Sequence, residues 1–196
     1  MTYFNRNRGY HWRYAKNARL RDLAEWEAYK TDYNMQDAER EHDGTIDVVF
    51  GSQGATITLG IIDGEASSLF SYGHCAILAW EIHMKTGLPL AVFTSENGRS
   101  GWSGHVAIQL DENKFLDIQG VADAEEIQRR YSSLRDGHEL VTDDEFKKLI
   151  VDEENWADPK QYLCELEQLV LAEFVDLVIA ENQDAIAAAQ EAVLTA

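Results

Sequence analysis

The sequence is poor in the residues that mark secreted, membrane-spanning and linker proteins. It has only two cysteines, Cys75 and Cys164, among 196 residues. A disulfide scaffold needs more, so the pair predicts two thiols in a reducing compartment, with a single bridge left open. Two prolines exclude a proline-rich linker, and no stretch approaches the ~18 apolar residues of a membrane helix. The start of the chain also lacks a secretory signal, so we expect a cytoplasmic protein that does not enter a membrane.

Basic residues are also scarce, and they are unevenly distributed. The chain has 17 basic and 35 acidic residues, for a net charge of −18. Residues 1–21 hold six basic and no acidic side chains, so the remainder carries 11 against 35, a net charge of −24. A body this acidic repels nucleic acid and anionic lipid and favours a basic protein partner. The cations and aromatic rings of residues 1–21 would suit a nucleic-acid-binding arm, but we expect them to lie on the acidic body.

Apolar residues, by contrast, are plentiful enough for a core. The chain is 45% hydrophobic and 27% charged, as is typical of a globular domain. We divide it into a basic aromatic arm (1–21), a core (22–135) and an acidic helical extension (136–196). The predicted elements are a helix at about 17–41, a hairpin within 45–62, a buried helix at about 74–85, strands at 88–93, 105–110 and 114–119, and a final helix at about 160–192. Their order indicates an α+β fold, and the apolar face of the final helix predicts a lid over the sheet or a dimer contact.

Three residues with reactive side chains lie at the ends of elements in the predicted core. Cys75 follows Gly73 in the first turn of the buried helix, where free backbone N–H groups and the helix dipole stabilise a thiolate. His105 opens a strand directly after a glycine-rich loop at 94–104, and Asp117 lies on the next strand. A thiol, an imidazole and a carboxylate can act as nucleophile, base and orienting group. For Cys75 the alternative is a small buried thiol that only packs in the core.

The register of the second hairpin decides whether His105 and Asp117 meet. With a three-residue loop at 111–113, Ala107 opposes Asp117 and His105 opposes Gln119. His105 and Asp117 then share one face of the sheet in diagonal contact. We therefore predict a hydrogen bond between their side chains and keep Gln119 as the reserve third member.

This block resembles the core of the papain-like thiol enzymes. The resemblance rests on Gly73-His74-Cys75 with Ala79, on Thr86-Gly87-Leu88-Pro89, and on the later His105 and Asp117, in the chain order of that superfamily. The compact spacing is nearer to the transglutaminase-like and NlpC/P60-like branches, and it is similar to a group of phage and bacterial proteins. The resemblance covers about residues 70–120. It implies a papain-like α+β fold, with Cys75 as nucleophile, His105 as general base and acid, and Asp117 as the orienting residue.

Further residues are candidates for binding rather than for the covalent step. The backbone N–H of Cys75 and the side chains of Gln53 and Gln119 are candidates for holding an oxyanion. Substrate-binding candidates are Trp102, Gly104 and His74. The histidines do not have the spacing of zinc ligands, so we expect no metal and no cofactor.

These observations predict a cysteine-dependent acyl-transfer enzyme that acts on amide bonds of a protein or peptide through a thioester at Cys75. Water as the acceptor gives a peptidase or deamidase, and an amine gives a transglutaminase-like product; the sequence leaves this choice open. The alternative is a non-catalytic acidic protein that keeps a papain-like scaffold and binds a basic partner, such as a host protein if the chain is phage-encoded. A third reading is a nucleic-acid-linked role through residues 1–21.

Overall fold

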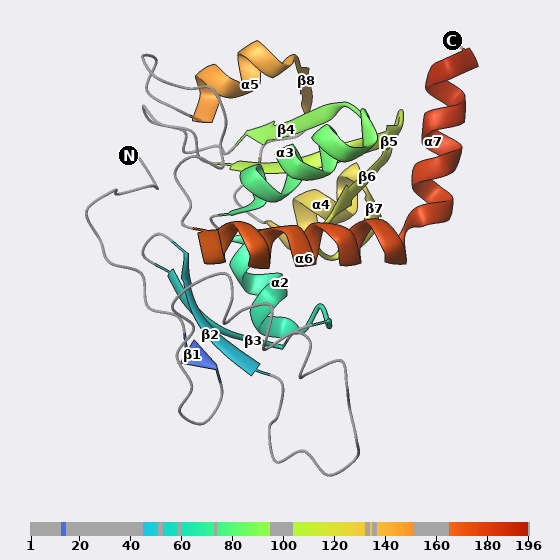
Figure 1. Cartoon of the computed structure of the whole chain (residues 1–196). Coiled ribbons are helices and arrows are strands. Elements are labelled where there is room, and N and C mark those ends of the chain that lie inside the picture. The colour runs from blue at the N-terminus through green and yellow to red at the C-terminus, as the bar shows by residue number, and fades with distance from the viewer. Residues whose placement is uncertain are drawn as a thin grey trace.

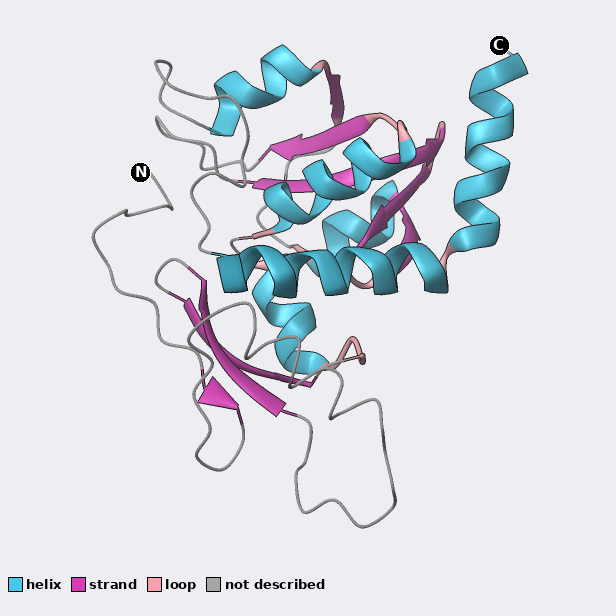
Figure 2. Cartoon of the chain, in the orientation of Figure 1, coloured by secondary structure: helices cyan, strands magenta, loops and turns pink. Residues whose placement is uncertain are grey.

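The chain folds into helices packed around two antiparallel sheets (Figure 1). The computed structural model describes residues 13–14, 45–50, 53–58, 60–72, 74–94, 104–131, 134, 137–150 and 165–195. Figure 2 shows how the helices and strands of these residues are distributed. This mixture of helix and antiparallel sheet agrees with the predicted α+β class. The predicted helix at about 17–41 lies outside the described residues.

The larger sheet has five strands in the order β7-β6-β5-β4-β8. Its strands are β4 (Leu90–Thr94), β5 (Gly104–Asp111), β6 (Lys114–Asp117), β7 (Gly120–Asp123) and β8 (Glu139–Val141). The first four follow one another along the chain, and β8 pairs with the outer side of β4. β8 therefore joins the sheet although it falls within the range expected as a C-terminal extension.

Helix α3 (Cys75–Thr86) lies across the larger sheet, and it is the buried helix that the sequence predicts. Every residue from Cys75 to Ile82 is buried, because almost all faces of this helix are apolar. Gly87 ends it in the left-handed region at φ 72°, and its N–H donates to the carbonyl of His83 at 2.7 Å. The predicted glycine stop is thus confirmed.

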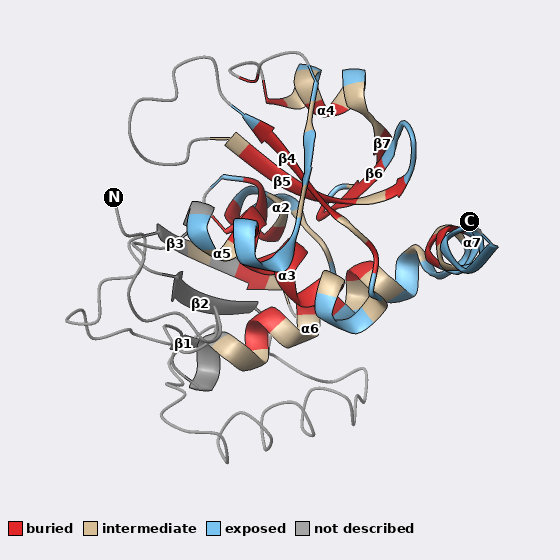
Figure 3. Ribbon diagram, turned by 90° about the horizontal axis from the view of Figure 1, so that it is seen from above, coloured by how far each residue is buried: buried red, intermediate tan, exposed pale blue. Residues whose placement is uncertain are grey.

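The two faces of the larger sheet bury separate groups of side chains, as strand alternation requires. Figure 3 shows that the central strands are buried over most of their length. One face packs on α3, which in turn packs on α6 (Glu165–Glu181), and the larger cluster joins them; it includes Val92, Val106, Ile108, Leu116, Val170, Phe174 and Val178. The other face is covered by α4 (Ala124–Arg130) through the smaller cluster, which comprises Ala91, Phe93, Ala107, Phe115, Ala122, Ile127, Tyr131 and Leu134.

The predicted final helix is two helices in the structure. α6 ends at Glu181 and α7 (Gln183–Thr195) begins after Asn182, whose side-chain amide donates to the carbonyl of Val178 at 2.8 Å. α6 packs on α3, and α7 lies beside β5. The prediction of one continuous helix was wrong because the apolar pattern runs on across Asn182, where the backbone turns. No helix in the described part of the chain is long and apolar enough to cross a membrane.

The smaller sheet packs beside α2 (Gly64–Ser71). Its strands run in the order β1 (Arg13–Tyr14), β2 (Thr45–Phe50) and β3 (Gln53–Thr58), so the predicted first hairpin is confirmed. Asp63 caps α2 by accepting the N–H of Ala66 at 2.8 Å, and α2 leads directly to the turn before Cys75. This helix was not predicted from the sequence.

The second hairpin differs from its predicted turn but keeps the predicted register. Lys114 pairs with Asp111, so the loop is the two residues 112–113 and not 111–113. A bulge between Gln109 and Asp111 inserts one extra residue, and Ile108 then pairs with Leu116. The shorter loop and the bulge cancel, so Ala107 still falls opposite Asp117 in register. β6 ends at Asp117, two residues earlier than predicted.

Candidate active site

Cys75 is the first residue of α3, and its side chain is held against the sheet. The residue is 3% exposed. His74 occupies the N-cap position with φ −120°, and its side chain makes no capping hydrogen bond to the helix. Cys75 thus lies at the N-terminus of a twelve-residue helix, the end that leaves backbone N–H groups free and carries the positive end of the helix dipole.

His105 and Asp117 form the hydrogen bond that the strand register predicts. His105 Nε2 lies 2.9 Å from Asp117 Oδ2, and the two residues are 1% and 3% exposed. His105 is the second residue of β5 and Asp117 the last of β6, so the pair lies where β6 stops. The other ring nitrogen, Nδ1, is buried and makes no hydrogen bond within the described part of the chain. That nitrogen is available to the thiol.

Two opposing effects set the charge of His105. Burial lowers the pKa of the imidazole, because it penalises the charged form. The electrostatic interaction with Cys75, together with the hydrogen bond and charge of Asp117, outweighs burial and raises the pKa of His105 to about 9. Cys75 and Asp117 thus both favour the charged form of the ring. At neutral pH the site therefore favours an imidazolium at His105.

Asp117 accepts further hydrogen bonds besides the one to His105. The backbone N–H of Gln119 donates to Oδ1 at 2.8 Å, and the hydroxyl of Tyr131 lies 3.3 Å from Oδ2. The guanidinium of Arg130 approaches Oδ1 at 3.6 Å. These contacts fix the carboxylate on both oxygens, which makes it a rigid acceptor for the imidazole.

Tyr131 and Ser71 complete the site, and the sequence analysis did not find them. The Tyr131 ring stacks on His105 with centroids 4.0 Å apart, and its hydroxyl lies 3.0 Å from Ser71 Oγ. Burial and the Asp117 carboxylate raise the pKa of Tyr131, so the residue stays a phenol and a donor. No local pattern marks either residue. Tyr131 comes 14 residues after Asp117, and Ser71 is 60 residues from Tyr131.

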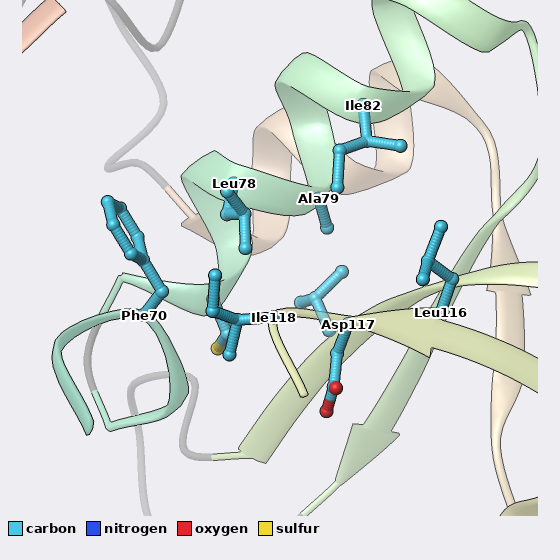
Figure 4. Close-up of a pocket in the computed structure, with 9 residues that line it drawn as sticks. Phe70, Leu78, Ala79, Ile82, Leu116, Asp117 and Ile118 are labelled. Atoms are coloured by element: carbon cyan, nitrogen blue, oxygen red, sulfur yellow. The ribbon is translucent and has the colours of Figure 1, made fainter. Parts of the chain in front are cut away.

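A narrow space separates α3 from strands β5 and β6 (Figure 4). Cys75 and Asp117 are the polar or reactive residues among the nine that line it; the others are Phe70, Leu78, Ala79, Ile82, Val106, Leu116 and Ile118. The space has no room for a water molecule. The inner side of the site is therefore dry, which strengthens every charge interaction within it.

Of the remaining predicted residues, His74 directly precedes Cys75 and is buried, and Gln119 lies on the other side of Asp117. Gln119 lies in the turn after β6, where its side-chain amide donates to Ser71 Oγ at 3.1 Å and to the Tyr131 hydroxyl at 3.4 Å. It therefore supports the site from the far side of Asp117 and is not hydrogen-bonded to His105. Gln53 lies in β3, but its side chain, like Trp102 and Cys164, lies outside the described residues.

Gly104 opens β5 beside His105, and the geometry there demands glycine. A Cβ atom at this position would lie 2.1 Å from the carbonyl oxygen of Phe93, far inside contact distance. Gly104 thus lets β5 approach β4 closely where Gly104 pairs with Thr94, next to the pair of Phe93 and His105. Its role in the structure is this close backbone approach.

The described part of the chain contains no candidate metal site. No group of three or more His, Cys, Asp or Glu side chains there could hold a metal ion. His83, one of the histidines considered in the sequence, hydrogen-bonds through Nδ1 to the carbonyl of Leu88 at 2.7 Å and through Nε2 to Asp143 at 3.1 Å. It serves the end of α3.

The site as a whole combines a thiol at a helix N-terminus with an imidazolium held by a buried carboxylate. Such a set can supply a nucleophile, a proton donor and acceptor, and a group that orients the ring. In comparisons with protein-family models, with curated proteins and with solved structures, none matches this chain.

Proposed function

We propose that this protein is a cysteine-dependent acyl-transfer enzyme with a papain-like core, acting on amide bonds of a protein or peptide. The observation that carries the proposal is the arrangement around His105. His105 Nε2 is hydrogen-bonded to Asp117 at 2.9 Å, and Nδ1 has no hydrogen bond among the described residues. Cys75 is close enough to raise the pKa of the ring. A histidine that only packed in the core would not need one ring nitrogen bound to a carboxylate and the other left for a thiol.

The reaction begins with the Cys75 thiolate. Sγ attacks the acyl carbon of the amide and forms a C–S bond, and the carbonyl electrons move to oxygen. When the oxyanion collapses, the C–N bond breaks and the His105 imidazolium gives its proton to the leaving amine. The products of this half are a free amine, a thioester on Cys75 and a neutral His105.

The second half restores the enzyme. His105 takes a proton from water, the oxygen attacks the thioester carbon, and the C–S bond breaks to release a carboxylic acid and the thiolate. An amine in place of water gives a new amide by the same steps. Asp117 keeps the ring in one orientation throughout and stabilises the imidazolium when it forms.

Backbone N–H groups in the first turn of α3 are the best-supported donors for the oxyanion. They are the free donors that every helix N-terminus leaves, and Cys75 is the first residue of this helix. The side-chain amide of Gln119 already donates to Ser71 and Tyr131, so its use as an oxyanion donor requires those bonds to break.

The burial of the site favours a second candidate function. Cys75, His105 and Asp117 are each 3% exposed or less, as residues of a structural network would be. In this reading the protein keeps the scaffold without the reaction, and its net charge of −18 recruits a basic protein partner. The two functions differ in one property, namely whether the thiol can react in the folded protein.

Thiol alkylation in the folded chain separates them. The Cys164→Ala variant leaves Cys75 as the single thiol of the chain. Its rate of reaction with iodoacetamide is measured from about pH 5 to pH 10, with Cys75→Ala as the blank. An enzyme is expected to react well at pH 6, and His105→Ala is expected to slow that reaction at least about tenfold, because the imidazolium that stabilises the thiolate is gone.

A second measurement follows the protonation of His105. Followed by NMR, the pKa of His105 should fall from about 9 toward the ordinary value near 6.5 in Cys75→Ser. A thiol that reacts only after unfolding, with no effect of Cys75→Ser on His105, would overturn the enzyme proposal. Capture of basic proteins that weakens with salt would then support the second function. With a reactive thiol, incubation with a panel of peptide amides should leave an acylated Cys75 that hydroxylamine removes.

A further inference from the structure

The hydroxyl and ring of Tyr131 connect parts of the site that are distant in sequence. Tyr131 immediately follows α4, on the face of the sheet opposite α3. Its ring stacks on His105 at 4.0 Å and 23°, and its hydroxyl lies within hydrogen-bond distance of Ser71 and Asp117. Ser71 ends α2, four positions before Cys75. One side chain thus contacts the imidazole, its carboxylate partner and the segment that leads to the nucleophile.

We propose that Tyr131 is a positioning residue for the proposed acyl transfer, with its ring holding the His105 imidazolium and its hydroxyl tying the Cys75-bearing segment to Asp117. The inference rests on the proposed function. It assigns to Tyr131 an effect on the charge and orientation of His105 that mere packing in the smaller cluster would not produce.

The ring acts on the imidazolium through its π face. A cation stacked on an aromatic ring at this distance is stabilised by the quadrupole of the ring, and the effect grows where water is excluded. His105 is 1% exposed and Tyr131 7% exposed, so the contact is dry. The stacked ring also blocks rotation of the imidazole away from Asp117 Oδ2.

The hydroxyl acts through a chain of hydrogen bonds. Gln119 Nε2 donates to Ser71 Oγ, Ser71 and Tyr131 share a bond of 3.0 Å, and Tyr131 lies 3.3 Å from Asp117. Because hydroxyl protons rotate, each group in this chain can donate toward the carboxylate. The charge of Asp117 favours that order and strengthens each bond in turn.

Charged and titratable groups reach His105 from three sides. Cys75 acts from α3, Asp117 from β6 and Tyr131 from the end of α4. Arg130 on α4 contacts Asp117 at 3.6 Å and so acts on the ring indirectly. Since Tyr131 is a phenol and carries no charge, any effect of its removal on the titration of His105 comes from the ring and its hydrogen bonds.

The test compares variants of Tyr131 in the full chain by the NMR titration of His105 and by alkylation of Cys75 at about pH 7. In Tyr131→Leu the pKa of His105 is expected to fall by about one pH unit, and alkylation to slow about tenfold. Tyr131→Phe keeps the ring, so it is expected to keep the His105 titration within about 0.3 pH units of the wild type. If Tyr131→Leu does not fold, Tyr131→Met fills a similar volume without a π face.

Ser71→Ala tests the hydroxyl part of the inference. Ser71→Ala and Tyr131→Phe both break the Ser71–Tyr131 bond, and Tyr131→Phe also removes the bond to Asp117. Both are expected to slow alkylation by a factor of about two to five while leaving the His105 titration in place. An unchanged His105 titration in a folded Tyr131→Leu or Tyr131→Met variant overturns the inference. A lowered His105 pKa beside a wild-type thiol that does not react overturns the proposed function and leaves the positioning of His105 by Tyr131 intact.

Discussion

The two faces of the five-stranded sheet are held together by different means. Toward α3 the contacts are mostly apolar, and the polar pair Lys85 with Asp176, which joins α3 to α6, is exposed. Toward α4 the cluster is smaller, and it adjoins the buried hydrogen bonds around His105 and Asp117. Apolar packing depends on volume and tolerates exchange, whereas a buried polar network depends on each donor and acceptor. The site lies where the rigid, polar side meets the N-terminus of α3.

The largest effect is expected from Asp117→Asn, which keeps the size of the side chain and removes its charge. The buried imidazolium then loses its counter-charge, and the free energy of unfolding should fall by about 3 kcal/mol. A volume-conserving exchange in the larger apolar cluster, Ile108→Leu, is expected to cost less than about 1.5 kcal/mol. Urea denaturation of both variants measures the contrast. Equal losses would show that the polar face is no more demanding than the apolar one.

The next largest effect concerns the close approach of β4 and β5 beside His105. Gly104→Ala puts a Cβ atom against the Phe93 carbonyl, so the strands must separate, and we expect a loss of about 2–3 kcal/mol in the free energy of unfolding. The matched control is Gly64→Ala, where a Cβ atom meets nothing within 4 Å. That variant should be neutral or slightly stabilising, by up to about 1 kcal/mol. Thermal unfolding of both distinguishes a tight contact from a general effect of adding a methyl group.

The polar face should also make stability depend on pH. Because folding raises the pKa of His105 to about 9, its stabilisation is complete below about pH 6.5 and is lost as pH rises through 9. The part of the free energy of unfolding that His105 contributes should therefore fall with pH across this window. His105→Gln is expected to flatten this slope. A stability that rises with pH in this window would contradict the assignment of the charge to His105.

The smallest effect is expected where a polar pair is exposed. Asp176→Asn makes the same chemical change as Asp117→Asn, but the side chains of Lys85 and Asp176 are 41% and 67% exposed, so water and salt screen their attraction. The expected loss is below about 0.5 kcal/mol, and it should vanish at about 1 M salt. A loss approaching that of Asp117→Asn would mean that burial does not explain the difference between the two faces.

Much of the site follows from short stretches of sequence. Gly87 ends α3 where its left-handed backbone requires, and the apolar residues of α3 predict its burial. Strand alternation predicts that His105 and Asp117 share a face, although the turn between them is shorter than expected and a bulge restores the register. The papain-like resemblance stays a prediction that alkylation of Cys75 tests.

Other parts had no local signal. α2 is short and amphipathic only in part, and the apolar pattern of the C-terminal region did not mark the break at Asn182. Gln119 lies beside the predicted position, but it bonds to Ser71 and Tyr131 and not to His105. These outcomes depend on how elements that are distant in sequence pack together. Residue spacing along one strand does not predict that packing.

The sequence by itself determined the buried helix with Cys75 at its start, the glycine that ends it, and the strand register that places His105 against Asp117. Those features depend on hydrogen bonds and side-chain periodicity within windows of a few residues. Only the tertiary structure decided that Tyr131 and Ser71, 60 residues apart, would meet at the same carboxylate. Their contact requires α2, α4 and the sheet to pack in one arrangement, and the free energy of that packing is spread over the whole core.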